Sequence, residues 1–449
     1  MEIRENRDAE PAKPAGSSRP AYRDGNVLRW LGAYAASILG DSVYFLALSW
    51  AATQAAGPGQ AGMVMAVGAV PRAVLMLGGG VIADRLGPRR VLIASDAARA
   101  VVLLGAAAAL ALASPGLWLL VVVALVFGVV DALFMPAIGA LPPRITTPDQ
   151  LARTQGLRTL AQRLGTVAGP SVGGFAMATS GAAGTFAAAG LVFAGSLALL
   201  VTLRISGPGG NVSLNSPDAP EEPQGWSGQG IQQEHDEEAQ KAEQRSPWRD
   251  LAAGVGYLRQ HGLLLPLVMV AWLAELGFSG PFNIGLALLA DLRGWGPAGM
   301  GLVIAAFGAG AVVGALWLAA RGGMGRAGLT GAWMMLLGGV SVTGLGMLPS
   351  LPAALAAAAL AGLTAGVTAG VFSALLQTAT DPAYMGRVTS VLVLLTVGIV
   401  PLSYPLTGSL IGLLGPEPVF AAYGGICVLA TAIVLAVPRL RGAELAGRA

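Results

Sequence analysis

Long apolar runs constrain this chain more than any other feature of its sequence. Hydrophobic residues make up 54% of the 449 residues and charged residues only 11%, whereas soluble domains carry about 25% charged residues. A helix of about 20 apolar residues crosses the hydrocarbon core of a bilayer. We therefore predict an all-α membrane protein with twelve transmembrane helices in two six-helix pseudo-repeats. The predicted spans are 27–52, 61–83, 90–113, 117–140, 156–178, 184–204, 263–290, 297–320, 328–348, 351–375, 388–413 and 418–437.

Polar segments divide these spans into two halves. The stretch between the sixth and seventh spans is acidic and rich in Pro, Gly and Ser, a composition that does not form a packed core. The stretch just before the seventh span is amphipathic, which favours a helix lying on the membrane surface. In chain order we predict a disordered cytoplasmic tail (1–26), a six-helix bundle (27–204), a disordered cytoplasmic linker (205–247), an amphipathic surface helix (248–262), a second six-helix bundle (263–437) and a cytoplasmic tail (438–449).

Arginine and lysine residues are distributed very unevenly between the two sides. Of these 27 residues, only Arg293 falls in a loop on the side opposite to the chain ends, and only Arg72 lies well inside a span. Segments rich in Arg and Lys remain cytoplasmic, so we predict a multi-pass inner-membrane protein with both termini in the cytoplasm. Arg85 follows the second span and Arg321 follows the eighth in the same way. This repetition indicates a transporter whose site lies between two related halves.

Composition excludes several other classes of protein. One cysteine and two histidines give no basis for a metal site, so we expect no metal and no cofactor. The two lysines, Lys13 and Lys241, lie outside any phosphate-binding loop, which argues against ATP hydrolysis by that route. The sequence contains no HExxH motif and no obvious nucleophile–base pair, so no motif indicates an enzyme. We also expect no nucleic-acid partner.

A glycine- and arginine-rich motif, GGGVIADRLGPRR, stands between the second and third spans. It resembles the motif that marks the major facilitator superfamily in the same loop. The resemblance implies that Asp84 contacts the start of the eleventh span near Arg387 and holds the cytoplasmic side closed. A carboxylate is stabilised at a helix N-terminus, which makes this contact physically reasonable. The residues of this gating motif are Gly80, Asp84, Arg85, Gly87, Arg89 and Arg90, with Arg387 as the partner.

The fifth span carries GLRTLAQRLGTVAGPSVGG, which resembles the antiporter motif of the superfamily's drug exporters. Glycines four residues apart form a bare face for close helix packing, and a proline adds a kink. The same glycines also suit ordinary packing. Residues 27–437 resemble the branch that contains enterobactin and macrolide exporters, and this implies export. The motif residues are Gly156, Gly165, Gly169, Pro170, Gly173 and Gly174.

Four ionisable residues lie well inside the predicted spans, namely Asp41, Arg72, Asp131 and Glu275. Each costs at least about 2.5–3.5 kcal/mol at the bilayer centre unless it is paired or hydrated. Asp41 and Arg72 lie at a similar depth, about 18 Å from the cytoplasmic edge, so we predict an ion pair or a shared water between them. Such a pair suits either transport or a purely structural clasp. Asp131 equally suits a helix–helix contact.

The resemblance also implies that spans 1, 4, 7 and 10 line a central cavity, and three of the carboxylates fall on these spans. Burial disfavours a charged carboxylate and a nearby cation favours it, so a carboxyl between water and an apolar wall can load and release a proton. Glu275 is the first candidate because the sequence places no cation near it, and Asp41 is the second. Polar and aromatic residues extend the same helix faces. The predicted lining residues are Ser37, Tyr44, Phe45, Phe127, Phe134, Phe282 and Asn283.

These features predict a secondary transporter that exports a small amphiphilic molecule by proton antiport and alternating access, as a monomer in the bilayer. The fourth span lacks the arginine that many drug–proton antiporters of the superfamily carry, so their proton relay does not transfer to this chain. Two alternatives remain open at this point: an uptake permease of the same fold, and a transport-inactive membrane sensor or scaffold.

Overall fold

The computed structural model describes residues 24–75, 85–113, 115–146, 150–203 and 247–445, and these residues are almost entirely helical. Glycine–proline pairs begin several helices. Gly87 and Gly415 have φ angles of 84° and 83°, which side chains disfavour, and a proline at the first helical position needs no N–H partner. The elements are α1 (Gly25–Ala55), α2 (Pro58–Leu75), α4 (Pro88–Leu112), α5 (Gly116–Ala140), α6 (Pro142–Ile145), α7 (Leu151–Val201), α9 (Pro247–Gln260), α10 (Leu264–Gly280), η3 (Pro281–Gly285), α11 (Leu286–Leu292), α12 (Gly296–Arg321), α13 (Ala327–Met347), α14 (Leu351–Ala379), α15 (Met385–Leu414), α16 (Pro416–Ala436) and α17 (Pro438–Arg441).

Ten helical segments of the described residues are long and apolar enough to cross a membrane. One of them, α7, consists of two arms joined at Gly181, whose φ of 65° and ψ of −168° turn the chain. Another runs over Leu264–Leu292 and combines α10, η3 and α11. Helix α2 is not among the ten, and it is described only as far as Leu75. The count of twelve spans therefore stays a prediction, whereas the helical class and the two-bundle arrangement are observed.

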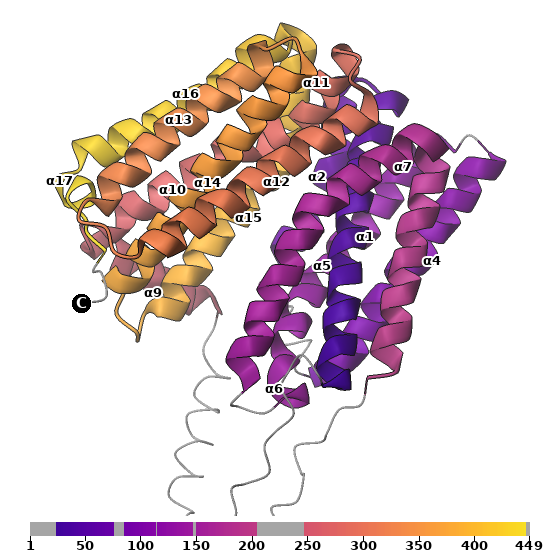
Figure 1. Ribbon diagram of the computed structural model, residues 1–449, viewed down its shortest axis with the longest axis horizontal. Helices are drawn as coiled ribbons and strands as arrows, with labels where there is room; N and C mark the ends of the chain where they lie inside the picture. Colours follow the sequence, from indigo (N-terminus) through magenta and orange to yellow (C-terminus); the bar gives the residue numbers. More distant parts are fainter. Residues whose placement is uncertain (1–23, 76–84, 114, 147–149, 204–246, 446–449) are drawn as a thin grey trace, which may run out of the picture.

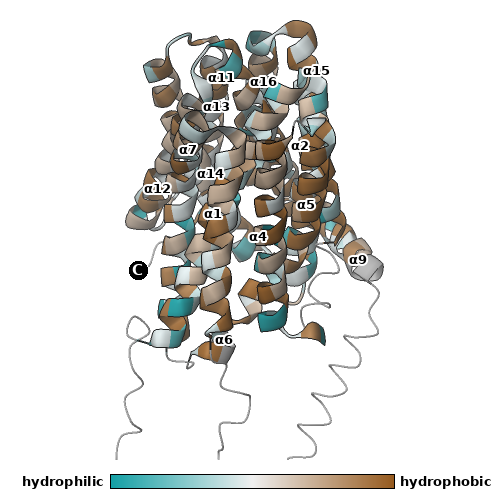
Figure 2. Cartoon of the chain, turned by 90° about the vertical axis from the view of Figure 1, so that its right-hand side faces the viewer, coloured by the Kyte–Doolittle hydropathy of each residue, from teal (hydrophilic) through white to brown (hydrophobic). Residues whose placement is uncertain are grey.

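The outer surface of the helices is strongly apolar. Leu112 is 87% exposed and Val101 is 70% exposed. Figure 2 shows hydrophobic residues over most of α2, α5 and α15. Soluble monomers rarely expose apolar patches larger than a few hundred Å², so this surface is suited to lipid.

The helices form two bundles that meet on one side of the molecule and diverge on the other (Figure 1). The first bundle contains α1, α2, α4, α5 and α7, and the second contains α10 to α16. We call the side where α1 begins and α16 ends the terminal side, and the side where α1 ends and α2 begins the distal side. Near the distal side one hydrophobic core joins both bundles and includes Tyr44, Phe127, Ile284 and Tyr404. Toward the terminal side each bundle has its own core.

Glycines make the closest contacts between the bundles, and these contacts lie toward the distal side. Helix α7 crosses α12 where Gly174 faces Pro297, and α2 crosses α15 where Gly62 faces Tyr404. A Cβ atom on Gly174 would stand 2.5 Å from the Pro297 carbonyl oxygen, and one on Gly62 would stand 2.5 Å from that of Tyr404. Only glycine permits such close backbone approach. The two bundles are thus joined on the distal side.

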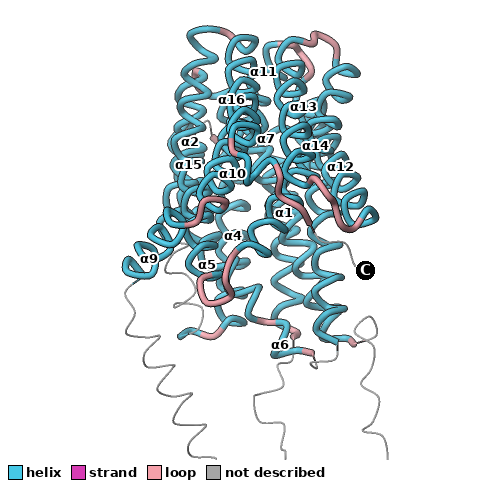
Figure 3. Tube along the Cα trace, turned by 90° about the vertical axis from the view of Figure 1, so that its left-hand side faces the viewer, coloured by secondary structure: helices cyan, strands magenta, loops and turns pink. Residues whose placement is uncertain are grey.

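Helix α9 lies beside the start of α15 (Figure 3). The ring of Tyr257 stacks on that of Tyr384 with centroids 4.3 Å apart, and the Tyr257 hydroxyl accepts a hydrogen bond of 3.2 Å from the Asp381 amide. The helix occupies the range predicted for a surface helix, 248–262, and its placement on a membrane leaflet stays a prediction. The segments predicted to be disordered, 1–26 and 205–247, fall almost entirely outside the described residues.

Candidate functional site

Five charged side chains form a cluster within the first bundle, and four of them are buried. At its centre is Arg99 of α4, whose side chain is 0% exposed and lies about 16 Å from the start of the helix at 1.5 Å per residue. Its guanidinium lies 3.5 Å from the carboxylate of Asp96 and 3.8 Å from that of Asp41 on α1. It also hydrogen-bonds to Asp131 on α5. Arg72 of α2 joins the charge cluster through Asp131, at 3.9 Å.

Two serines hold the carboxylate of Asp96. Ser37 of α1 donates to Oδ2 at 3.0 Å, and Ser196 of α7 donates to the same oxygen at 2.5 Å. The Ser196 hydroxyl also lies 2.9 Å from the carbonyl oxygen of Ala33 on α1. These contacts tie α1, α4 and α7 together. Ser37, predicted as a cavity-lining residue, is instead buried in this network.

Aromatic rings surround the buried guanidinium. The Arg99 Cζ atom lies 4.3 Å from the ring centroid of Phe134, 5.2 Å from that of Phe193 and 5.9 Å from that of Phe127. Cation–π contacts of this kind stabilise a cation away from water. Phe134, a further residue predicted to line the cavity, therefore packs against a buried cation.

The charge cluster has an unequal number of charges. Arg72 and Arg99 supply two positive charges, while Asp41, Asp96 and Asp131 can carry three negative ones. An uncompensated charge in a buried site is unfavourable, so a proton or a further cation bound to one carboxyl group would stabilise the cluster. Asp41 has the weakest bonding of the three, since its Oδ1 atom is buried without a hydrogen-bond partner among the described residues.

The structure corrects the predicted pairing of the intramembrane charges. No ion pair joins Asp41 to Arg72 among the residues described; Asp41 faces Arg99, and Arg72 faces Asp131. Asp96 and Arg99 are not evident from the sequence, because the apolar run that contains them begins close to a basic loop and Arg99 can be assigned to that loop. Their spacing of i,i+3 on one helix face was the available signal, because such a pair can enter an apolar span together.

A cavity of about 310 Å³, the central cavity, lies between the two bundles. Its walls carry Arg72 and Asp131 from the first bundle and Glu275 from the second. A neighbouring cavity of about 410 Å³ lies between α1, α7 and α12 and is lined by Phe282, Asn283, Arg72 and Arg163, among others. Of the predicted lining residues, those on the central cavity are Tyr44, Phe45, Phe127 and Asn283. Asp41, Ser37 and Phe134 line neither of the two, because the charge cluster draws them inward.

The segment that carries Glu275 changes its helical pitch at this level. Helix α10 continues into a π-helical turn at Pro281–Gly285 before α11. Proline cannot donate a backbone hydrogen bond, and π-turns are frequent at functional sites because they widen the helix locally. The Asn283 side chain, which lies on this turn, donates a 2.8 Å hydrogen bond to the carbonyl oxygen of Ser279. Both residues line the central cavity with Glu275.

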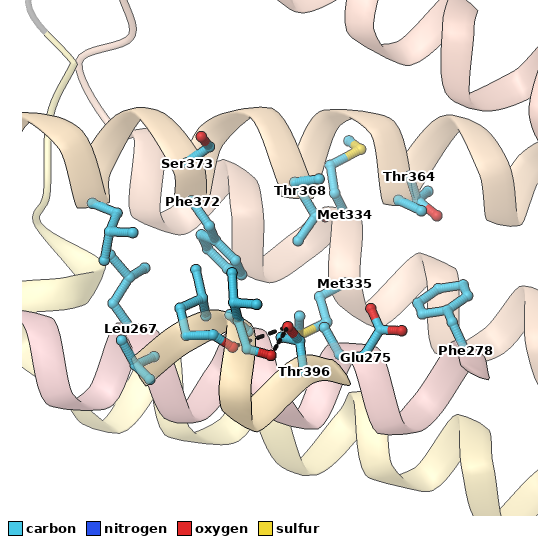
Figure 4. Close-up of a pocket in the computed structure, with 18 of the residues that line it drawn as sticks. Leu267, Glu275, Phe278, Met334, Met335, Thr364, Thr368, Phe372, Ser373 and Thr396 are labelled. Atoms are coloured by element: carbon cyan, nitrogen blue, oxygen red, sulfur yellow. Dashed lines mark hydrogen bonds between the residues drawn. The ribbon is translucent and has the colours of Figure 1, made fainter. Parts of the chain in front are cut away.

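A third cavity, of about 430 Å³, lies within the second bundle between α10, α12, α13, α14 and α15. We call it the second-bundle pocket. Its walls are apolar except for a few hydroxyl groups, and Glu275 is its one ionisable residue among those the structure describes. Figure 4 shows the Glu275 side chain projecting from α10 into this pocket beside Phe278. Glu275 and Thr396 line both this pocket and the central cavity.

The glycines of the antiporter motif have two packing partners. Gly165, Gly169 and Gly173 face Ile38, Ser42 and Val43 of α1 respectively, so that α7 packs closely on α1 along one face. The carbonyl oxygen of Pro170 and the backbone of Gly174 lie against Gly301 of α12 in the other bundle. In the described part of the chain, no residue of another element lies within 4 Å of the position that a Cβ atom on Gly156 would take.

The gating motif is only partly described. Gly80 and Asp84 lie outside the described residues, so the implied contact between Asp84 and Arg387 stays a prediction. Arg85 and Arg90 are exposed, and Arg89 donates a 2.7 Å hydrogen bond to the carbonyl oxygen of Val201. Gly87 supplies the positive φ that precedes α4. The guanidinium of Arg387 lies 5.2 Å from the ring centroid of Tyr384 at the start of α15.

Comparisons with known proteins agree with this architecture. The chain is 25% identical over 367 residues to the enterobactin exporter EntS of Shigella boydii, which covers 81% of this chain and 80% of that protein. In structure it resembles a D-xylose–proton symporter with a TM-score of 0.64 at 16% identity, covering 93% of this chain and 98% of the symporter. It resembles the human organic anion transporter MFSD10 with a TM-score of 0.58 at 16% identity, covering 93% of this chain and 100% of that chain.

A protein-family profile also matches most of the chain. Residues 30–402 match the Major Facilitator Superfamily, which is the family that the loop motif between α2 and α4 resembles. The match covers the first bundle and the second bundle as far as Leu402 in α15, and it includes the residues that line the second-bundle pocket. The protein is therefore a membrane transporter and not an enzyme, and the chain belongs to the major facilitator superfamily.

Proposed function

We propose that this transporter exports a small amphiphilic molecule across the cytoplasmic membrane in exchange for protons. The observation that carries the proposal is the charge cluster, in which two arginines face three carboxylates beside the central cavity. A site of this kind binds one proton or one cation at a time. Export is supported by the similarity to an enterobactin exporter, at 25% identity, and by the helix motif that packs α7 on α1 and α12.

The orientation of the chain gives this proposal its direction. Because basic residues concentrate on the terminal side, that side is assigned to the cytoplasm. The bundles are joined by glycine contacts on the distal side, where Gln54 of α1 also donates a 2.7 Å hydrogen bond to Asp291 of α11. The described conformation would then be the one that loads substrate from the cytoplasm. Rocking of the bundles about the central cavity would release it outside.

Two carboxylates are proposed to carry the proton. Glu275 lines the central cavity and makes no ion pair with any residue in the described part of the chain, so a proton or a cationic group can neutralise it. Asp41 is the second candidate, because the charge cluster has three carboxylates and only two arginines to neutralise them. The protein is proposed to act as a monomer, since each chain contains both bundles and the cavity between them.

Replacing Asp41 by asparagine is expected to preserve the stability of the protein and to weaken the coupling of substrate transport to protons. The change equalises the charges of the cluster at two and two, so the melting temperature of the purified protein should stay the same or rise. Proton-driven accumulation of substrate should fall about tenfold or more, because one proton site is lost. Downhill exchange of substrate should continue. The variant Asp381→Asn, on an exposed turn, should leave all three measurements unchanged; loss of downhill exchange in Asp41→Asn would speak against a coupling role.

Everted membrane vesicles test the proposal as a whole. Uptake of a macrolide or a cationic dye would be followed in vesicles that do or do not contain the protein. We expect uptake that stops when the proton gradient is collapsed. Accumulation in right-side-out vesicles instead would identify an uptake permease. Absence of flux in both orientations for every probe would identify a sensor or scaffold.

A further inference from the structure

We propose that the second-bundle pocket is a binding site for a lipophilic monocation, with Glu275 as its counter-charge. This inference rests on the proposed transport function for its place in a cycle, but binding itself can be measured without transport. The inference names the chemical class of ligand, which neither the family nor the exporter similarity gives.

The shape and walls of the pocket fit a compact apolar body. Its volume of about 430 Å³ lies within the range of roughly 300–1,000 Å³ that small-molecule sites occupy. Met334 and Met335 of α13 and Leu267 of α10 contribute flexible aliphatic walls. Methionine side chains adapt to ligands of different shape, so the pocket favours a class of compounds over a single one.

The aromatic residues favour a cation within that class. Phe278, Phe307 and Phe372 enter the pocket from α10, α12 and α14. The ring centroids of Phe278 and Phe307 lie 6.1 Å apart at an interplanar angle of 46°, so two tilted aromatic rings stand side by side on the pocket wall. Faces of phenylalanine rings attract ammonium and other organic cations, and desolvation strengthens this attraction. An anion would meet no compensating charge here.

Glu275 supplies the charge that such a cation needs. It is the sole ionisable side chain on the pocket wall in the described structure. On its other side, Arg72 and Asp131 line the central cavity with it and pair with each other at 3.9 Å. Glu275 therefore stands at the junction of an apolar pocket and a polar cavity, where a bound cation and a proton would compete for one carboxylate. Competition of this kind is what exchange transport requires.

The hydroxyl groups of the pocket give a second indication of a ligand. Thr364 and Thr396 donate to carbonyl oxygens of their own helices, at 2.9 Å in both cases, so they are satisfied within the protein. Thr368 differs, because it is 6% exposed and its Oγ1 atom has no hydrogen-bond partner among the described residues. A buried hydroxyl without a partner is unfavourable. It is available to a polar group on the ligand.

Isosteric ions of opposite charge test the inference directly. Tetraphenylphosphonium and tetraphenylborate have nearly the same shape and differ in the sign of their charge. Binding of each would be measured by equilibrium dialysis to the full-length protein in lipid nanodiscs. We expect saturable binding of the phosphonium ion and at least about tenfold weaker binding of the borate ion, because only the cation pairs with the carboxylate.

Four variants locate the bound cation. Glu275→Gln keeps the shape of the side chain and should weaken phosphonium binding about tenfold or more. Glu417→Gln, the same change at an exposed residue on the distal side, should leave it unchanged. Ala369→Phe, which fills the pocket without altering its charge, should also abolish binding, while Ala369→Ser should retain it. Each variant is first checked for a single size-exclusion peak.

Several outcomes would overturn the inference. Equal binding of the two ions, or phosphonium binding that survives both Glu275→Gln and Ala369→Phe, would mean that the pocket holds lipid or detergent chains. Failure of the wild-type protein to bind the phosphonium ion would also reject the inference. If another substrate still crossed the vesicle membrane in that case, the proposed transport function would stand. Conversely, phosphonium binding without any vesicle flux would support the site and reject the transport proposal.

Discussion

Replacing Arg99 by methionine is expected to destabilise the protein by about 3–5 kcal/mol, the cost of removing one partner from a buried ion pair. Methionine matches the length of the arginine stem, so packing changes little while Asp41, Asp96 and Asp131 lose their shared cation. The free energy of unfolding in detergent micelles, followed by tryptophan fluorescence, measures the loss. Transport should be abolished in the same variant.

The control for this prediction lies on the same helix. Arg90 is exposed near the start of α4, and Arg90→Met should change stability by no more than about 0.5 kcal/mol. If Arg99→Met does not fold, Arg99→Lys keeps the charge without the forked geometry and should show an intermediate loss. Adding Asp41→Asn to Arg99→Met should recover part of the stability. A loss below about 1 kcal/mol in Arg99→Met would show that the carboxylates are not held by this cation.

Replacing Gly174 by alanine is expected to push the two bundles apart on the distal side. The added methyl group would stand 2.5 Å from the carbonyl oxygen of Pro297, and a backbone atom cannot rotate away from it. Overpacking of this size costs about 1–3 kcal/mol, which corresponds to a shift in conformational populations of roughly fivefold to 150-fold. Because the strain exists only while the distal side is closed, the outward-open state should gain population.

Distances between spin labels report this shift. Labels at Ala113 and Ser350, on exposed distal turns of the first and second bundles, should move apart in Gly174→Ala. The single native cysteine, Cys427, would first be replaced by serine. Gly195 is on the same helix and has nothing within 4 Å of a built Cβ atom, so Gly195→Ala should reproduce the wild-type distances. Unchanged distances in Gly174→Ala would mean that this contact does not set the conformation.

Much of the fold follows from the sequence because hydropathy and helix-breaking residues are local signals. The predicted span 297–320 is found as Gly296–Arg321, and 351–375 as Leu351–Ala379. The turn at Gly181 falls between the predicted spans 156–178 and 184–204, where only glycine tolerates the positive φ. The spacing of Gly165, Gly169 and Gly173 predicted a bare packing face, and these residues lie against α1.

The candidate site was predicted less well because pairing depends on the rotation of helices. Depth along the axis placed Asp41 near Arg72, but rotation of α1 directs its carboxylate toward Arg99 instead. A charge in an apolar run that begins at a basic loop, such as Arg99, has the same sequence signature whether it is solvated or buried. The second-bundle pocket is lined by residues from five helices. No local sequence pattern predicts that these residues lie close together.

Proton movement driven by substrate tests most directly whether Asp41 of the charge cluster and Glu275 of the central cavity exchange a proton for a cationic substrate. The purified protein would be reconstituted in liposomes that enclose a pH-sensitive dye, and a gradient of the substrate alone would be imposed. We expect proton flow opposite to the substrate, present in the wild-type protein and absent in the double variant Asp41→Asn, Glu275→Gln. Substrate flux with no accompanying proton flow, or proton flow that persists in the double variant, would contradict it.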